Sequence, residues 1–476
     1  KRSKVQTEAL LTLVAHCGSA NNFQDKRVFQ KKNAISSGTL LALIKKGILE
    51  EVEEIDGTTA ASAPLTEITL SAQQLEALSS IQKGFEAKKP VVLHGVTASG
   101  KTELYITLIK EAFTKHKRVL YLLPEIALTT QLISRLRIHF TVAVSHSKFS
   151  PAERLAAWRE ALTNDAPLLV LGARSAVFMP LPDLGLIIVD EEHETSYKQF
   201  EPSPRYNARD AAIVLSHLHQ GKILLGSATP SLESYFNATE KKYGFVELKR
   251  RFGEVKLPKI QLVDIKEKQR KREMTGHFSD TLLKQIQEEL DQKKQVILFQ
   301  NRRGFSPVVE CKTCGVSPQC PNCDVSLTFH KYKQELKCHY CNYQRAMPNS
   351  CGACGSNTLN TKGFGTEQIE LELKELFPNH IIGRMDLDTT RGKFGYQKII
   401  GAFEAKEIDV LVGTQMLSKG LDFDNVSLVG ILNADMMLNF PDFRAHERAF
   451  QLMVQVSGRA GRSKKQGKVM IQTYNP

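Results

Sequence analysis

The sequence predicts an α/β protein with two tandem parallel-sheet domains, a small module before them and a cysteine-rich insertion within the second domain. The chain has 476 residues, more than one hydrophobic core usually spans. Short apolar runs alternate with helical stretches, which is typical of parallel sheets covered on both faces. Eight of the nine cysteines occur as four closely spaced pairs, which indicates a separately stabilised unit.

The composition narrows the class of protein. Hydrophobic residues make up 42% and charged residues 24%, the balance of an ordinary globular protein. The sequence contains neither a signal peptide nor an apolar run of the roughly eighteen residues that a membrane helix needs. The formal net charge of +13 favours a polyanionic partner, nucleic acid before an anionic membrane.

Residues 1–57 predict a small helical module. Apolar residues recur at helical spacing in two stretches, and an alternating stretch, Ile48–Ile55, leads to a turn at Asp56-Gly57. Two helices and a hairpin indicate a winged-helix-like module. A helical docking domain that binds no nucleic acid fits equally well. Residues 58–64 are rich in Thr, Ala, Ser and Pro, and predict a linker.

Residues 65–250 predict the first parallel-sheet domain, and 251–305 with 361–476 predict the second. Strands are expected at Pro90–Leu93, Val119–Leu123, Leu168–Leu171, Leu186–Val189, Ile223–Leu225, Gln295–Phe299, Ile381–Met385, Asp409–Val412, Val426–Leu432 and Lys468–Gln472. The basic segment Lys249–Arg272 between the domains is interpreted as a solvated connector or a phosphate-contacting strip. Residues 306–360, which hold the cysteine pairs, interrupt the second domain after its first strand.

One motif matches the phosphate-binding pattern G-x-x-x-x-G-K-[ST]. Its residues are Gly95, Val96, Thr97, Ala98, Ser99, Gly100, Lys101 and Thr102. Glycines allow successive N–H groups to converge on phosphate oxygens at a helix N-terminus. Lys101 is expected to reach the β- and γ-phosphates, and the Thr102 hydroxyl to bind Mg²⁺. A predicted strand before the motif and a helix after it favour an ATP site over a chance match.

An acidic motif follows another predicted strand. Leu186–Val189 runs directly into Asp190-Glu191-Glu192-His193. This places Asp190 at the carboxyl edge of the sheet, beside the phosphate loop. We expect Asp190 to bind Mg²⁺ and Glu191 to polarise the attacking water. A surface acidic cluster is the alternative, which the phosphate loop in the same sheet disfavours.

A glycine–arginine segment, Gln455–Arg462, lies near the end of the second domain. Arg459 and Arg462 are three residues apart and share a face if the segment is helical. They are expected to stabilise charge on the γ-phosphate from the second domain. An ordinary loop or a nucleic-acid contact is the alternative for these arginines.

The cysteines predict two structural zinc sites. A chain without a secretion signal disfavours disulfides, and four C-x-x-C pairs favour zinc thiolates. The spacing of the second and third pairs resembles a zinc ribbon. It predicts an inner site and, by nesting, an outer one; the inner ligands are Cys320, Cys323, Cys338 and Cys341, and the outer ones Cys311, Cys314, Cys351 and Cys354. Four thiolates leave no open position on the metal, so both sites are expected to be structural.

A loop after the acidic motif mixes aromatic and basic residues. Tyr197, Phe200, Arg205 and Tyr206 lie in a segment broken by two prolines. Such a mixture suits base stacking and phosphate contact with single-stranded nucleic acid. Aromatic residues that anchor the loop onto its own domain are the alternative.

Several segments together resemble a known family. Leu122–Leu128, Gly172–Ala176, Asp190–His193, Gly226–Pro230, Asn301–Phe305, Gly413–Gly420 and Gln455–Arg462 look like consecutive motifs of superfamily 2 helicases. The four-pair insertion and Pro441–Ala445 narrow the resemblance to the PriA family of primosomal replication-restart helicases (primosomal protein N′). It covers about Leu65 to Pro476.

The resemblance implies two RecA-like lobes that close over ATP and Mg²⁺. It also implies 3′-to-5′ DNA helicase activity at stalled forks, and single-stranded DNA-binding protein and primosome proteins as partners. Gln74 matches the adenine-contacting glutamine, Gln455 lies in the last motif, Arg459 and Arg462 match the arginine fingers, and Tyr197–Tyr206 matches the DNA-coupling loop. A monomer without a membrane contact is expected, in the bacterial cytoplasm at the nucleoid.

The chain also departs from the family pattern. Family members carry an N-terminal domain that captures the nascent 3′ end and a C-terminal domain after the last motif. We expect this chain to be a fragment that lacks both and still hydrolyses ATP. Asn433 replaces an expected aspartate.

Three other classes remain open at this stage. A translocase that does not separate strands would share both lobes, and so would an RNA-directed enzyme. A zinc-stabilised nucleic-acid-binding scaffold with an inactive ATP site is the non-enzyme alternative.

Overall fold

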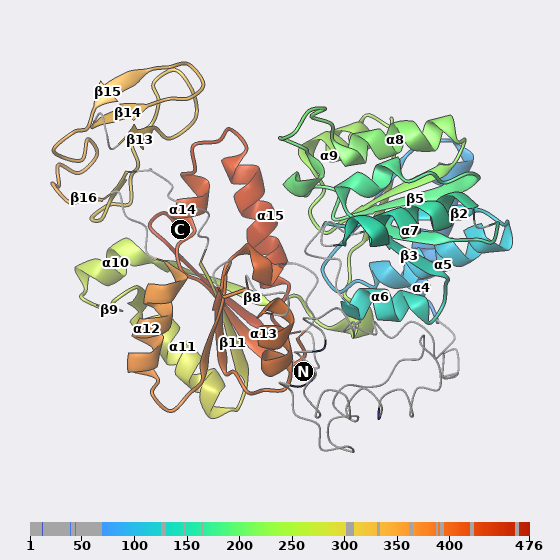
Figure 1. The fold of residues 1–476 in the computed structure, drawn as a ribbon. Coiled ribbons are helices and arrows are strands. Elements are labelled where there is room, and N and C mark those ends of the chain that lie inside the picture. Colours follow the sequence, from blue (N-terminus) through green and yellow to red (C-terminus); the bar gives the residue numbers. More distant parts are fainter. Residues whose placement is uncertain are drawn as a thin grey trace, which may run out of the picture. The chain divides into compact units, whose positions relative to one another are not determined.

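The computed structural model describes residues 69–124, 130–145, 149–163, 165–300, 309–330, 334–360, 365–386, 389–390, 395–418, 423–461 and 466–476, together with residues 12, 39 and 43. The chain divides into two compact units, residues 1–65 and 66–476. The winged-helix-like module predicted at 1–57 and the linker at 58–64 lie outside the described residues, apart from the three single positions. The second unit contains two lobes and the cysteine-rich insertion (Figure 1).

The first lobe is built on a seven-stranded parallel sheet with the order β3-β4-β2-β5-β6-β1-β7. Its strands are β1 Val91–Gly95, β2 Arg118–Leu122, β3 Val142–Ser145, β4 Leu169–Gly172, β5 Leu184–Asp190, β6 Lys222–Ser227 and β7 Gly244–Leu248. Its helices are α4 Ala72–Glu86, α5 Lys101–Thr114, α6 Thr130–Arg137, α7 Pro151–Thr163, η2 Arg174–Phe178, η3 Thr195–Tyr197, α8 Ala208–Leu218, α9 Leu232–Thr239 and η4 Phe252–Glu254.

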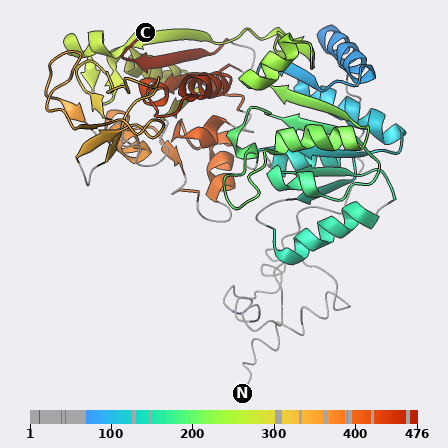
Figure 2. The same ribbon diagram turned by 90° about the horizontal axis from the view of Figure 1, so that it is seen from above.

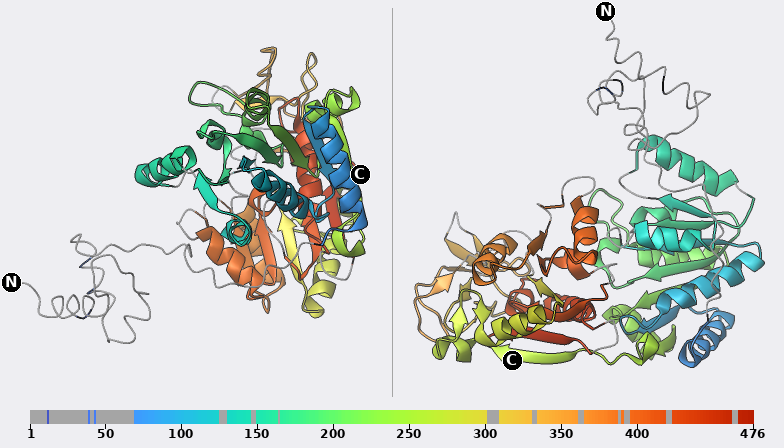
Figure 3. Two further views of the ribbon diagram at one scale, coloured as in Figure 1. Left: turned by 90° about the vertical axis from the view of Figure 1, so that its right-hand side faces the viewer. Right: turned by 90° about the horizontal axis from the view of Figure 1, so that it is seen from below.

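Alternation along the strands divides the core of this lobe into two layers. Val91 and Leu93 of β1 face the layer formed with α4 and α5, and Val92 faces the layer formed with α7 and α8. Figure 3 shows α4 and α5 (blue to cyan) next to each other. Because both faces are covered, the central strands are almost wholly apolar, as the sequence predicted.

The second lobe has a six-stranded parallel sheet with the order β17-β18-β11-β19-β20-β8. The red β20 and the yellow-green β8 run side by side at its edge (Figure 2). Helices α13 and α15 cover one face, and α11 and α12 the other. The elements are β8 Lys259–Asp264, α10 Ile265–Arg270, β9 Met274–Thr275, β10 Phe278–Ser279, α11 Asp280–Asp291, β11 Gln295–Phe299, α12 Thr366–Leu376, β17 Ile382–Met385, α13 Gly395–Glu404, β18 Val410–Gly413, η5 Gln415–Ser418, β19 Val426–Ile431, α14 Asp435–Leu438, α15 Ala445–Ser457 and β20 Lys468–Thr473.

The cysteine-rich insertion lies between β11 and α12 and contains only very short strands. β12 (Glu310–Cys311) pairs with β16 (Leu359–Asn360), and an antiparallel sheet joins β13 (Thr328–His330), β14 (Glu335–Lys337) and β15 (Gln344–Ala346). A small core joins these strands, with Leu327, Leu336 and Cys338 at its centre. The insertion therefore has little apolar material of its own.

The structure confirms the predicted α/β class, with two parallel-sheet lobes and a cysteine-rich insertion in the second. Of the strands in the two parallel sheets, three were missing from the prediction: β3, β7 and β8. Part of Lys249–Arg272, interpreted as a connector or a phosphate-contacting strip, forms β8 and α10. All three strands lie at the edge of a sheet. In β8, for example, Ile260 and Leu262 stay exposed. These strands therefore lack the buried apolar run that marked the others. None of the described helices meets the length and apolarity that spanning a bilayer requires.

Candidate ATP site and zinc centres

The phosphate-binding loop joins β1 to α5 at the carboxyl edge of the first sheet. The Ser99 N–H donates to the Val96 carbonyl over 3.1 Å, and the Lys101 ammonium donates to the Gly95 carbonyl over 2.8 Å. Gly100 has a φ of 82°, and a Cβ there would lie 2.3 Å from the Gln74 amide nitrogen. Glycine is therefore required at this position on two counts. Lys101 and Thr102 follow as the first residues of α5, where phosphate binds favourably.

Gln74 is a buried residue of α4, and its side chain contacts the loop. Its amide nitrogen donates to the Gly100 carbonyl over 3.0 Å. Its amide oxygen accepts from the Ser71 N–H over 2.9 Å, which completes the N-terminal cap of α4. The adenine contact predicted for Gln74 remains a prediction, and its position beside Gly100 is compatible with it.

Asp190 ends β5 and is surrounded by tyrosine hydroxyls. Tyr105 donates to Oδ1 over 3.0 Å, Tyr121 to Oδ2 over 3.3 Å, and Tyr197 to the Asp190 carbonyl over 2.7 Å. Burial and the nearby charge of Glu191 raise the pKa of the Asp190 carboxyl to about 6, against the effects of Lys101 and the Tyr105 hydrogen bond. Burial raises the pKa of all three phenols, so they remain hydrogen-bond donors.

Glu191 and His193 are linked to the second lobe through Gln455. The Gln455 amide nitrogen lies 3.3 Å from a Glu191 carboxylate oxygen and 2.9 Å from His193 Nε2. His193 Nδ1 lies 2.7 Å from the Ser227 hydroxyl. With its proton on Nδ1, His193 donates to Ser227 and accepts from Gln455, so both ring nitrogens have a partner. The expected water-polarising carboxylate thus contacts a residue of the other lobe.

The glycine–arginine segment lies against the phosphate loop. A Cβ on Gly458 would come within 2.5 Å of the Thr97 side chain. The Arg251 guanidinium donates to the Gly461 carbonyl over 2.8 Å and approaches the Thr97 hydroxyl at 3.4 Å. Arg459 follows Gly458 and is buried, with its charge near Tyr396 of α13, whereas Arg462 lies outside the described residues. The sequence analysis included Arg251 only as one residue of the basic segment Lys249–Arg272, because it belongs to no motif.

Glu192 belongs to the acidic motif, but the sequence analysis assigned it no role. It is buried, and its carboxylate accepts from the Ser231 N–H over 2.7 Å and from Arg209 over 3.1 Å. Ser234 also donates to it, over 2.8 Å. Glu192 thereby joins the acidic motif to α8 and α9. Its position between Glu191 and His193 is the sequence feature that could have drawn attention to it.

One face of α15 contacts the first lobe at three successive turns. Glu447 accepts from the Leu232 N–H over 3.0 Å, and the Gln451 amide approaches the Thr229 carbonyl at 3.4 Å. Gln455 makes the third contact, described above. Residues four apart on a helix share a face, so the three side chains form one ridge that is slightly inclined to the helix axis.

The aromatic and basic loop 197–206 is only partly exposed. Tyr197 is buried and bonded to Asp190, so its ring is not available for base stacking in this arrangement. The ring of Tyr206 packs edge-on against Phe178 at 4.8 Å. Phe200 is 65% exposed, and Arg205 is exposed as well. Of the four predicted DNA-coupling residues, these two therefore face solvent.

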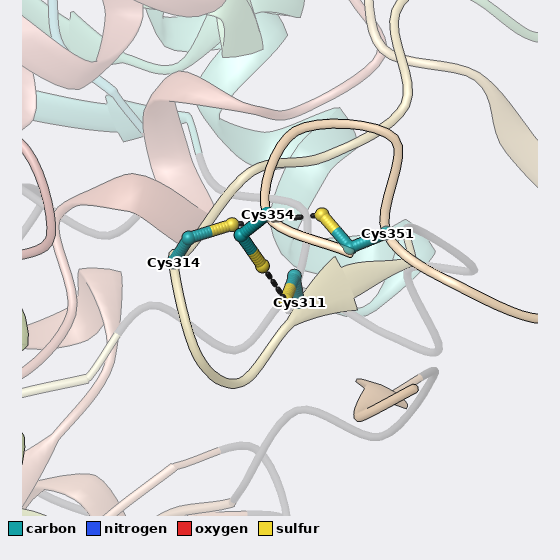
Figure 4. Close-up of side chains that lie close together, drawn as sticks. All are labelled: Cys311, Cys314, Cys351 and Cys354. Atoms are coloured by element: carbon teal, nitrogen blue, oxygen red, sulfur yellow. Dashed lines mark hydrogen bonds between the residues drawn. The ribbon is translucent and has the colours of Figure 1, made fainter. Parts of the chain in front are cut away.

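The eight cysteines form two groups in which four sulfurs lie within 4.8 Å of one another. Figure 4 shows the group of Cys311, Cys314, Cys351 and Cys354, with the sulfurs turned toward one another. The other group is Cys320, Cys323, Cys338 and Cys341, which is the nested arrangement. Three pairs of these sulfurs are 3.5 to 3.6 Å apart. Zinc–sulfur bonds of about 2.3 Å in a tetrahedron place sulfurs about 3.8 Å apart, so both groups fit Zn²⁺ and neither forms disulfides.

Three of the four cysteine pairs share one turn. The residue four after the first cysteine, Gly315, Asn342 or Gly355, has a positive φ and donates its N–H back to that cysteine's carbonyl. Glycine and asparagine tolerate this conformation, which explains the repeated C-x-x-C-G and C-x-x-C-N pattern.

Asn433 has a structural role in the second lobe. Its side-chain oxygen accepts from the Met436 N–H over 3.1 Å, next to the short helix α14. An aspartate oxygen could accept the same bond, so the replacement is compatible with the local structure.

The first lobe carries a phosphate loop and an acidic strand end, and the second parallel-sheet lobe contacts both. This arrangement defines a two-lobed helicase core. The sequence model of DEAD/DEAH box helicases matches residues 71–237, that of the helicase conserved C-terminal domain 364–464, and that of the PriA DNA helicase Cys-rich region 320–345. The chain belongs to the PriA family. ATP with Mg²⁺ and two Zn²⁺ are its cofactors.

Individual relatives support the same assignment. Replication restart protein PriA of Bacillus subtilis is 44% identical over 457 residues, which cover 94% of this chain and 56% of that protein. Replication restart protein PriA of Haemophilus influenzae is 40% identical over 489 residues, which cover 100% of this chain and 64% of that protein. The chain thus spans less than two thirds of these relatives. The structure of the DUF1998 helicase MrfA bound to DNA shares the fold, with a TM-score of 0.53 at 16% identity over 90% of this chain and 49% of that one.

Proposed function

We propose that the chain is the motor core of an ATP-dependent DNA helicase that moves 3′ to 5′ on single strands at stalled replication forks. The relatives named as replication restart proteins support this role. Single-stranded and forked DNA are its substrates, and single-stranded DNA-binding protein and primosome proteins its partners. It acts as a monomer in the bacterial cytoplasm, at the nucleoid.

The ATP-site residues divide the chemistry between the lobes. Lys101 neutralises the phosphates, and Thr102 with Asp190 holds Mg²⁺, which supplies charge stabilisation. Glu191 orients the attacking water. Gln455 positions Glu191, and Arg459 and Arg462 stabilise charge that develops on the γ-phosphate. Because the last three residues belong to the second lobe, hydrolysis depends on lobe closure.

The contact of Gln455 with Glu191 carries this proposal. A side chain of the second lobe lies 3.3 Å from the carboxylate expected to orient water in the first. Gly458 beside Thr97 supports the same closure at the phosphate loop. A scaffold with an inactive ATP site would have no need for such contacts.

DNA is expected to act through the loop 197–206. Phe200 and Arg205 are exposed and suit stacking and phosphate contact. Tyr197 connects the loop to the backbone of Asp190. DNA that shifts the loop would therefore move the metal-binding carboxylate.

Single-stranded-DNA-stimulated ATPase of Lys101→Ala and Arg459→Ala tests the proposal. Each variant is expected to lose on the order of 10³-fold in turnover, since positioning and charge neutralisation carry phosphoryl transfer. Lys110→Ala, an exposed lysine of the same helix α5, serves as the control with normal turnover. Near-wild-type activity in either active-site variant would overturn the assignment.

A panel of nucleic acids separates helicase from the other motors. ATPase and strand displacement are measured with single-stranded, duplex and forked DNA and with RNA of equal length, at one fixed salt concentration. Strand displacement on forked DNA is the expected result. ATPase without displacement would indicate a translocase, and equal stimulation by RNA would remove the DNA specificity.

A further inference from the structure

Two tyrosines that belong to none of the helicase motifs converge on Asp190. Tyr105 comes from α5 and Tyr121 from β2, and both are fully buried. Each donates its hydroxyl to a different oxygen of the carboxylate, over 3.0 and 3.3 Å. Their rings pack edge to face with centroids 5.6 Å apart. The carboxylate is therefore held at both oxygens.

We propose that Tyr105 and Tyr121 are positioning residues that fix the Asp190 carboxylate in the orientation in which it binds Mg²⁺. The inference rests on the proposed ATPase function. Neither phenol is a metal ligand or a catalytic residue; each acts through Asp190. Hydrogen-bond partners behind a metal-binding group commonly change metal affinity or activity by about 10- to 100-fold when they are removed.

The number of hydrogen bonds leaves room for the metal. A carboxylate offers roughly four lone-pair positions. Tyr105 and the Glu191 N–H use two of them at Oδ1, and Tyr121 uses one at Oδ2. One lone-pair position of the carboxylate remains, at Oδ2. The three donors therefore fix the rotamer of Asp190 and leave that position for Mg²⁺ or its bound water.

Gly226 makes the arrangement possible. A Cβ at this position would lie 1.8 Å from the Tyr105 hydroxyl and 3.3 Å from Asp190 Oδ1. No larger residue could occupy position 226 while the hydroxyl stays in place. The glycine of the Gly-Ser-Ala-Thr segment thus provides the space in which the phenol reaches the carboxylate.

Tyr105 also ties Asp190 to the helix that carries the phosphate ligands. It follows Lys101 by four residues on α5 and therefore lies on the same side of that helix. A shift of α5 on nucleotide binding would move Lys101, Thr102 and the Tyr105 hydroxyl together. The metal-binding carboxylate and the phosphate-binding lysine are thus held in one geometry.

Tyr105→Phe and Tyr121→Phe test the inference, because each removes one hydroxyl and keeps the ring. The Mg²⁺ concentration for half-maximal ATPase is expected to rise about tenfold in each variant. A fluorescent ADP, titrated with and without Mg²⁺, gives a second readout. The gain in affinity that Mg²⁺ confers should shrink by a similar factor, while affinity in EDTA stays unchanged.

Tyr235→Phe, a tyrosine of the same lobe whose ring packs edge-on against Phe245, is the control and should alter neither readout. Unchanged Mg²⁺ dependence in both active-site variants would overturn the inference, whatever their thermal stability. Equal loss of ADP affinity with and without Mg²⁺ would also overturn it, since that indicates general damage. A wild-type protein without ATPase activity would instead refute the proposed function.

Discussion

The two lobes and the cysteine-rich insertion differ in the source of their folding free energy. Each lobe has a sheet of six or seven strands with apolar cores on both faces. The insertion has strands of two or three residues and one small core, in which two zinc-ligand cysteines are themselves members. Apolar burial supplies the folding free energy of the lobes, and metal binding supplies that of the insertion.

From this difference we expect the lobes and the insertion to unfold independently of each other. A perturbation of the metal should leave the lobes folded, and a perturbation of the lobe core should leave the metal bound. The buried Asp190 carboxylate forms a third case, in which the proposed function opposes stability. The predictions below test these separations in order of expected effect.

Zinc removal should have the largest effect. Each structural zinc contributes about 10–16 kcal/mol to folding, so a chelator should unfold the insertion. Limited proteolysis should then cut within residues 309–360, while circular dichroism still reports folded lobes. Untreated protein should contain two equivalents of zinc. Cys338→Ser should lose the zinc of its own group and keep the other.

A protein purified without chelator that holds one equivalent or none would contradict the two-site arrangement. Simultaneous melting of lobes and insertion after zinc removal would contradict the separation. The exposed Thr313→Ala, beside the ligand Cys314, is a control that should keep both ions.

A core substitution in the first lobe should come next. Ile188 lies in the middle of β5 and is fully buried. Ile188→Ala should cost about 2–5 kcal/mol of unfolding free energy, through lost burial and a cavity. Chemical denaturation measures this cost, and zinc content should remain at two equivalents. Val214→Ala, on the exposed side of α8, should change stability by less than about 0.5 kcal/mol.

Asp190 should oppose stability while it serves the site. Its pKa is raised to about 6 from 3.8, so between these values the folded protein binds more protons than the unfolded one. Unfolding free energy should therefore fall as the pH rises from about 4 to 6, by about 1–3 kcal/mol. Asp190→Asn should remove this dependence and abolish ATPase. Parallel pH–stability curves for the two proteins would contradict the assignment.

Tyr197→Phe should produce the smallest effect. It removes the hydrogen bond to the Asp190 carbonyl and keeps the buried ring. Loss of one such hydrogen bond costs about 1 kcal/mol, a factor of about five in an equilibrium constant. If this bond transmits the effect of DNA to Asp190, stimulation of ATPase by single-stranded DNA should fall about fivefold. Basal ATPase should change less than the stimulation does. Tyr235→Phe, an exposed tyrosine of α9, is the control, and equal stimulation in both variants would break the proposed link.

The sequence predicted most of the fold because buried parallel strands leave a continuous apolar signal. The central strands β2, β5 and β11 appear as such runs, and the structure has them. Edge strands give a weaker signal, since one side meets solvent. β8 alternates lysine and glutamine with isoleucine and leucine, and its pairing with β20 depends on residues some two hundred positions away.

The site was predictable where chemistry requires a fixed local spacing. The phosphate loop and the cysteine pairs are of this kind, because their ligands come from neighbouring positions. Tyr105 and Tyr121 reach the site from separate elements, and nothing in their local sequence marks them. The basic segment Lys249–Arg272 includes Arg251 but does not single it out. Their roles depend on which strands lie side by side, which only the three-dimensional arrangement gives.

The row of Glu447, Gln451 and Gln455 on α15 has a consequence for motion between the lobes. The three side chains are evenly spaced on one helix, and they face the Leu232 amide, the Thr229 carbonyl and Glu191. A slide of less than one helical turn, about 5.4 Å, leaves all three without partners at once. We therefore expect the three contacts to break together, rather than one after another, when the lobes slide along this helix.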